Sequence, residues 1–244
     1  MFRLIDSGLC HPLYTVALEE VIMESCTKGL MPPTLHLYVR DRPTVSLGYF
    51  EKVSEAVDME AMMREKVFLV RRMSGGSTIF TDQGQLIFSL TVDQGALPRP
   101  EEAYAMTCSV LVNALRSLGL EAEHKPPNDV LFQGRKVSGS AQTRKRGMLM
   151  VHGTVLVDTD LDRMVRILRP RQDKRSRTRE EMTCLSEALK RTVGLQEVKN
   201  ALVPAFASVL EQRVVAIPVN DREKGRVRQL IEEKYGRKEY ILQF

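Results

Sequence analysis

The chain has no tryptophan, and it has only four cysteines among its 244 residues. Because Cys10, Cys26, Cys108 and Cys184 stand far apart without a CxxC pair, a zinc site or a disulfide framework is disfavoured. No segment approaches the roughly 20 apolar residues that a membrane span requires. The N-terminus also lacks the apolar core of a signal peptide. These absences predict a cytoplasmic protein with no membrane partner.

Composition and charge are those of an ordinary globular protein, with 43% hydrophobic and 27% charged residues. The net charge of +5 suits a phosphate-bearing ligand or an acidic partner and does not demand nucleic acid. A basic segment, Arg169–Arg179, is the one feature that favours a nucleic-acid-binding module. It lacks the interleaved aromatic residues that such a module uses, so no nucleic-acid partner is predicted.

Short apolar strands alternate with amphipathic helices along the chain. The alternation predicts an α+β fold with a mixed, largely antiparallel sheet flanked by helices. We expect one domain over residues 1–244, in which residues 195–244 form a C-terminal segment of helices and a strand. Strands are predicted at 2–6, 34–39, 44–49, 67–70, 85–92, 148–157 and 214–217, and the main helices at 12–28, 100–118, 196–212 and 221–235.

A polar hairpin lies at the centre of the sequence. Val130–Phe132 and Arg135–Ala141 have strand character, and Gln133-Gly134 between them forms a tight turn. Asn128 and Asp129 stand at the start of the hairpin.

On the returning strand, Lys136, Ser138 and Ser140 are spaced two apart and share one face if the strand is regular. Gly139 lets a ligand or another backbone come close. Such a face suits an anionic ligand with a metal ion, although a hairpin that simply faces solvent is an equal alternative.

A second candidate site follows the buried strand at 67–70. Arg71 and Arg72 precede the pair Gly75-Gly76, whose backbone N–H groups can approach an anion. The segment is neither a Walker A loop nor a GxGxxG loop. Further along, His152 lies within a strand, where a histidine is more often a hydrogen-bonded structural residue than a catalytic base.

Three stretches in order carry a resemblance to one family. Arg71–Asp82, with the sequence RRMSGGSTIFTD, resembles the RRxSGGGxVFHD motif of lipoate–protein ligases. Pro127–Ala141, which contains PNDV and GRKVSGSA, and His152–Leu156, with HGTVL, resemble the motifs that follow it in that family. The chain departs from the family pattern at Ser77, in place of a third glycine, and at Thr81, in place of a histidine.

The resemblance implies the fold shared with biotin ligases, in the biotin/lipoate protein ligase superfamily. It also implies an ATP-dependent lipoate–protein ligase, which forms lipoyl-AMP and then passes the lipoyl group to a lysine of a carrier domain. Lys136 would be the catalytic lysine, placed between the lipoate carboxylate and the α-phosphate of ATP. Asp129 would bind Mg²⁺. The residues implied in substrate and adenylate binding are Arg71, Arg72, Ser74, Gly75, Gly76, Ser77, Thr78, Asn128, Lys136, Ser138, Gly139, Ser140, Ala141, His152, Gly153 and Thr154.

The implied partner is a lipoyl carrier domain, either of a 2-oxoacid dehydrogenase E2 or of a glycine-cleavage H-type protein. Full-length ligases usually carry an accessory domain after the catalytic one, and we expect a separate accessory ligase subunit here. Lipoate and octanoate remain alternatives for the acyl group.

The alternative activity is an octanoyl- or lipoyltransferase that uses a cysteine acyl intermediate and no ATP. Relatives of that type place their cysteine shortly before the GRKV motif, and Leu118–Gly134 of this chain contains none. Cys184 could serve only if the basic segment folded over the site. The motifs therefore favour the ligase over the transferase.

Overall fold

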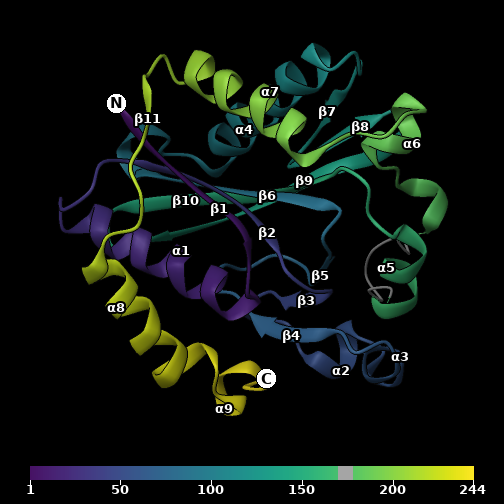
Figure 1. Ribbon diagram of the computed structural model, residues 1–244, viewed down its shortest axis with the longest axis horizontal. Helices are drawn as coiled ribbons and strands as arrows, with labels where there is room; N and C mark the ends of the chain where they lie inside the picture. The colour runs from purple at the N-terminus through teal and green to yellow at the C-terminus, as the bar shows by residue number, and fades with distance from the viewer. Residues whose placement is uncertain (170–177) are drawn as a thin grey trace.

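A computed structural model describes residues 1–169 and 178–244 of the chain. Among these residues, eight strands form a large sheet in the order β11-β1-β2-β6-β10-β9-β8-β7 (Figure 1). β1 pairs in parallel with β11 and β2, and the other neighbours are antiparallel. The predicted mixed, largely antiparallel sheet is confirmed. The strands are β1 (Phe2–Cys10), β2 (Thr34–Arg40), β6 (Gln85–Asp93), β7 (Glu123–Lys125), β8 (Asp129–Phe132), β9 (Arg135–Lys145), β10 (Met148–Leu156) and β11 (Val214–Ala216).

Helices cover both faces of the large sheet (Figure 1). α4 (Pro100–Ser117) and α7 (Leu195–Val209) pack on one face, where Phe88 of β6 meets Phe206 of α7. α1 (Pro12–Thr27) and α8 (Asp221–Leu230) lie on the other. Burying each such side chain contributes about 1.5–3 kcal/mol, which holds the layers together. No helix in the described residues is long and apolar enough to cross a membrane.

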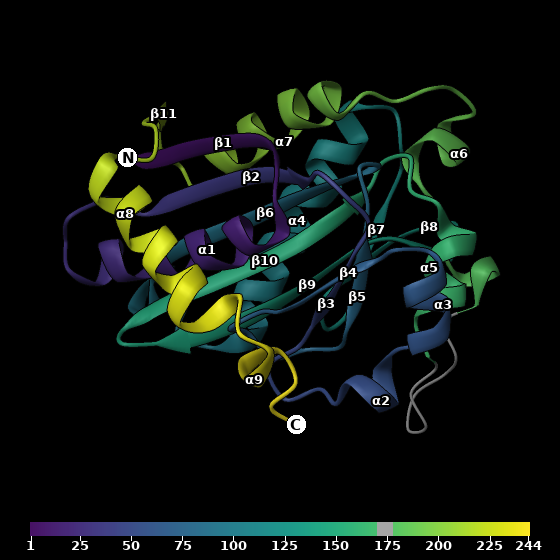
Figure 2. The same cartoon turned by 60° about the horizontal axis from the view of Figure 1, so that its bottom comes forward.

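A second sheet of three strands, in the order β4-β3-β5, lies beside the large one. Its core gathers Val45, Phe80 and Met164 from three elements. The short helices α2 and α3 lie on its outer side, at the opposite end of the molecule from β11 (Figure 2). The elements are β3 (Thr44–Leu47), β4 (Phe68–Arg71), β5 (Ile79–Thr81), α2 (Val53–Ala56), α3 (Met59–Arg64) and α5 (Leu161–Ile167).

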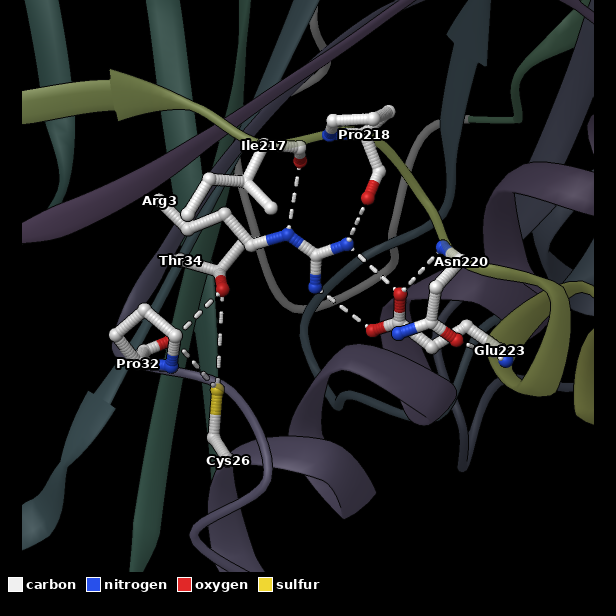
Figure 3. A network of polar contacts seen from close by, with 8 residues as sticks. All are labelled: Arg3, Cys26, Pro32, Thr34, Ile217, Pro218, Asn220 and Glu223. Carbon is white, nitrogen blue, oxygen red and sulfur yellow. Dashed lines mark hydrogen bonds and ion pairs between the residues drawn. The ribbon is translucent and has the colours of Figure 1, made fainter.

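The C-terminal segment is tied to the first strand by a buried ion pair (Figure 3). The Arg3 Nη1 atom lies 2.7 Å from Glu223 Oε1, and both side chains are almost wholly buried. Arg3 also donates to the carbonyls of Ile217 and Pro218 at 3.0 and 2.7 Å. The remaining elements are 3-10 turns at Gln94–Ala96 and Arg179–Glu181, α6 (Leu185–Leu189), a π-helical turn at Ile231–Tyr235 and α9 (Lys238–Ile241).

Candidate functional site

The predicted hairpin is present as β8 and β9, and its turn has the expected geometry. Gln133 and Gly134 have φ angles of 48° and 77°, the two positive values that a type I′ turn requires. The pairing is irregular further on, because Val130 is opposite Ser138 while Leu131 is opposite Lys136. One residue of β9 is therefore extra, which is a β-bulge.

The bulge changes the face on which Lys136 lies. A Cβ atom added to Gly139 would lie 2.5 Å from Lys136 Nζ, so the ammonium group rests on the bare backbone of Gly139. Ser138 and Ser140 alternate with Gly139 and are buried on the opposite face, at 1% and 8% exposure. The prediction that Lys136, Ser138 and Ser140 share one face is wrong, because it assumed a regular strand.

Lys136 forms an ion pair with Asp129, the first residue of β8. The two side chains are 24% and 30% exposed, so the pair lies at the surface of the site and can still reach a ligand. Asp129 was predicted as the Mg²⁺ ligand. In residues 1–169 and 178–244, no group of three His, Cys, Asp or Glu side chains is arranged to hold a metal ion.

The segment from Ser74 to Thr78, called the glycine loop below, is held from inside by Arg72. Arg72 donates to the carbonyls of Ser46, Gly75 and Ser77 at 2.8 Å each, and to Ser74 Oγ at 3.0 Å. Burial lowers the pKa of Arg72 to about 10, so the guanidinium stays charged at neutral pH. These four bonds fix the conformation of the loop.

Arg71 points away from the loop. Its Nη1 donates to the carbonyls of Gly48, Tyr49 and Glu51 at 2.8–2.9 Å, and its Nε donates to the Ile241 carbonyl at 2.9 Å. The side chain is wholly buried. Arg71 thus fastens the C-terminal helix α9 to the loop after β3, and the prediction that it lines the pocket is wrong.

Three small residues bring the glycine loop onto the hairpin. A Cβ added to Gly76 would lie 3.1 Å from the Ala141 Cβ atom on β9. A Cβ added to Gly48 would lie only 1.9 Å from the Gly76 carbonyl oxygen. Sequence reasoning missed Gly48, although a glycine inside the strand predicted at 44–49 was a signal of close backbone approach. Gly139 and Ala141 are two apart on β9, so the loop and the Lys136 ammonium lie on one face of the sheet.

A buried chain of polar groups lies beneath the loop. His152 Nε2 lies 2.7 Å from Ser74 Oγ, and His152 Nδ1 lies 3.1 Å from Glu19 Oε1. Tyr38 donates its hydroxyl to the same Glu19 oxygen at 3.1 Å. Burial opposes the charge on Glu19, but His152 and nearby cations outweigh it and lower the pKa of Glu19. His152 is thus the hydrogen-bonded structural residue that its place in a strand predicted; sequence reasoning missed Glu19 and Tyr38.

The other predicted residues contact groups within the protein. Thr78 Oγ1 contacts Glu51 Oε2 at 3.2 Å, and Asn128 Nδ2 donates to the Ser140 carbonyl. A Cβ on Gly153 would collide with the Phe88 ring, so a glycine is needed there for packing. Thr154 pairs with Gly139 across β9 and β10. Most of the basic segment, residues 170–177, lies outside the described residues.

Comparison with known proteins identifies the family. Residues 11–207 match the Lipoyl protein ligase A/B catalytic domain. The chain belongs to this family. The octanoyltransferase LipM of Anoxybacillus flavithermus is 31% identical over 271 aligned positions, which cover 98% of this chain and 97% of that protein. Since 271 exceeds the 244 residues here, LipM has positions without a counterpart in this chain.

Two solved structures have the same fold. A lipoate-protein ligase A bound with ATP superimposes with a TM-score of 0.88, at 27% identity and 98% coverage of both chains. A bi-partite lipoate protein ligase from Thermoplasma acidophilum, studied with its E2 lipoyl domain, gives a TM-score of 0.85 at 27% identity. That alignment covers 98% of this chain and 95% of the other.

These comparisons correct the predicted activity. The motifs favoured an ATP-dependent ligase, whereas the full-length relative at 31% identity is named an octanoyltransferase. The ligase prediction is wrong by this comparison, and the transferase alternative fits instead. ATP and Mg²⁺ were implied only by the ligase reading, and the pairing of Asp129 with Lys136 gives them no separate support.

Proposed function

We propose that this protein transfers an octanoyl- or lipoyl-type acyl group from an activated thioester to a lysine of a lipoyl carrier domain. The observation that carries the proposal is the Lys136 ammonium, held by Asp129 on the bare backbone of Gly139 and beside the glycine loop. The octanoyltransferase name of a full-length relative supports the choice of reaction.

The charge placement suits acyl transfer. Attack on a thioester carbonyl develops negative charge on its oxygen, and a positioned cation stabilises that charge more than it stabilises the ground state. Gly139 leaves the space that a side chain would fill, so a carbonyl group can approach Lys136 Nζ. The loop from Ser74 to Thr78, together with Ala141 and with Thr154, which pairs with Gly139, would bound the acyl chain.

The proposed acceptor is a lipoyl domain of a 2-oxoacid dehydrogenase E2 or an H-type protein. One structural neighbour was studied with its E2 lipoyl domain, which supports this class of partner. A separate accessory subunit was expected for an adenylation step. Transfer from a thioester has no such step, so the proposal assigns the accessory subunit no role.

The test compares two acyl sources in parallel. The purified chain is mixed with an unmodified lipoyl domain and given either octanoyl-coenzyme A or octanoylated acyl carrier protein without ATP, or free octanoate with Mg-ATP. Mass spectrometry of the lipoyl domain should show octanoylation from a thioester donor and none from the free acid. Modification only from free acid with Mg-ATP would overturn the proposal, and Lys136→Ala serves as the inactive control.

A further inference from the structure

We propose that Glu19 and Tyr38 are positioning residues for acyl transfer, which hold His152 in one tautomer and thereby fix the Ser74 hydroxyl at the start of the glycine loop. The inference rests on the proposed function and adds to it two residues from outside the sequence motifs. Glu19 belongs to α1 and Tyr38 to β2. Both are 1% exposed, so they act on the site through His152.

Strand pairing places His152 on the face of the sheet that carries the site. His152 lies opposite Ala141 of β9, and directly opposed residues of antiparallel strands share a face. Ala141 is the residue onto which Gly76 of the glycine loop packs. Glu19 and Tyr38 reach this face as well, because the Glu19 carboxylate lies 3.1 Å from both the His152 ring and the Tyr38 hydroxyl. The loop and the two buried residues therefore meet at His152.

The Glu19 carboxylate orients its partners more than it stabilises the fold. Replacing a buried charged group and its partner by apolar residues of similar volume often leaves a fold as stable as before. What apolar residues would not provide is a direction. Glu19 accepts the Tyr38 hydroxyl and an N–H group of His152, so it determines which ring nitrogen of His152 carries the hydrogen.

The donors and acceptors around Ser74 select one arrangement of hydrogens. The Arg72 guanidinium can only donate, so its Nε bonds the Ser74 Oγ atom at 3.0 Å. An ionised Glu19 can only accept, so Nδ1 of His152 carries the hydrogen of the bond between them. The neutral ring then leaves Nε2 as an acceptor for the Ser74 hydroxyl, at 2.7 Å. With a hydrogen on Nε2 instead, that hydroxyl would have only the Gly75 carbonyl, at 3.4 Å.

Ser74 transmits this orientation to the glycine loop. Its hydroxyl is tied to His152, and its carbonyl oxygen accepts the Tyr49 amide at 2.8 Å. Two residues later the loop packs on β9, where a Cβ on Gly76 would lie 3.1 Å from the Ala141 Cβ atom. Because the loop is closely packed, a displaced Ser74 displaces the wall of the site. A misplacement of about 1 Å can slow a reaction about 100-fold, so loss of orientation at His152 should slow transfer.

The first experiment determines the tautomer directly. Long-range proton–nitrogen NMR correlations of isotope-labelled protein at neutral pH show which nitrogens carry a hydrogen in its four histidine rings. The spectrum of His152→Gln lacks one set of signals and so assigns the His152 ring. We expect a hydrogen on Nδ1 only, and Glu19→Gln should shift the ring toward the other tautomer. A hydrogen on Nε2 in the wild type, alone or together with one on Nδ1, would overturn the inference.

The second experiment measures transfer from octanoyl-coenzyme A to a lipoyl domain, expressed per folded molecule. Glu19→Gln should lower kcat about 10- to 100-fold and leave the KM for the lipoyl domain unchanged, because the docking of the acceptor does not involve Glu19. Tyr38→Phe removes one of the two donors to Glu19 and should lower kcat less. Glu223→Gln is the matched control, since Glu223 is also a buried carboxylate but pairs with Arg3; it should transfer at the wild-type rate.

Ser74→Ala tests whether the residues act along one path. In a double variant with Glu19→Gln the two losses should not multiply, since Glu19 acts through Ser74. Multiplicative losses, or a Glu19→Gln rate equal to that of Glu223→Gln, would refute the positioning role. If the wild type transfers nothing from any thioester donor, the proposed function has failed. The positioning role then falls with it, even where NMR shows the expected tautomer.

Discussion

Two cation–carboxylate pairs in this molecule have the same chemistry and different surroundings. The Arg3–Glu223 pair has side-chain exposures of 0% and 3%, whereas the Lys136–Asp129 pair has exposures of 24% and 30%. Arg3 also donates to two backbone carbonyls. The difference in exposure separates them: the first pair fixes the C-terminal segment to β1, and the second is the one to which the proposed function gives a ligand.

The physical basis is the cost of an unpaired charge. In a buried pair, removing one partner leaves a charge that has lost both water and its counter-ion. In a partly exposed pair, water or a substrate can replace the missing partner at little cost. We therefore expect substitutions at Arg3 to affect stability and substitutions at Lys136 to affect the reaction.

The largest expected effect is that of Arg3→Ala on stability. Leaving the buried Glu223 charge unpaired should lower the free energy of unfolding by about 3–5 kcal/mol. Chemical denaturation measures the change. The double variant Arg3→Met with Glu223→Leu, which removes both charges, should lose less than Arg3→Ala alone. A loss under about 1 kcal/mol for Arg3→Ala would show that this pair does not hold the C-terminal segment.

Next in size is the effect of Lys136→Ala, which should reduce the rate of the reaction rather than the stability of the fold. The rate of acyl transfer should fall about 100- to 1,000-fold, since a donor to the developing oxyanion is lost. The free energy of unfolding should change by less than about 1 kcal/mol. Mass spectrometry of the lipoyl domain in samples quenched at successive times gives the rate of transfer. Chemical denaturation gives the free energy of unfolding. Strong destabilisation with unchanged transfer per folded molecule would place Lys136 with Arg3 as a structural residue.

A smaller effect is expected from Gly139→Ala. The added methyl group would lie 2.5 Å from Lys136 Nζ and must displace the ammonium. A displacement of about 1 Å should slow transfer roughly 10- to 100-fold. Gly194→Ala is the matched control, because nothing lies within 4 Å of its Cβ position and its φ is negative. Equal rates for the two variants would mean that the position of Lys136 on Gly139 does not matter.

The smallest effect concerns pH. Burial opposes ionisation of Glu223, but hydrogen bonds from Arg3 and the Asn220 amide outweigh it, and the pKa of Glu223 lies below its ordinary value of 4.5. A carboxyl with a lowered pKa stabilises the fold above its unfolded pKa and loses that contribution as pH falls. The free energy of unfolding should therefore decrease as pH falls below 4.5. Glu223→Gln should make this decrease shallower; an identical slope would contradict the assignment.

Local sequence was sufficient for much of the fold. Helices α1 and α4 were predicted to within one residue at each end, because their apolar spacing and their initial prolines are local signals. The turn at Gln133-Gly134 was also predicted correctly. The short strands β5 and β7, with three residues each, were missed because they are too short to show a period.

The sequence by itself was sufficient to predict the family motifs, the hairpin and the class of sheet, since each is visible in short stretches of consecutive residues. The tertiary structure decided which polar groups meet. Arg71 is held by Ile241, 170 residues away, and His152 by Glu19, 133 residues away. A single bulge placed Lys136 on the face of Gly139 rather than with Ser138. Such contacts depend on strand register and long-range packing, which one-dimensional spacing does not encode.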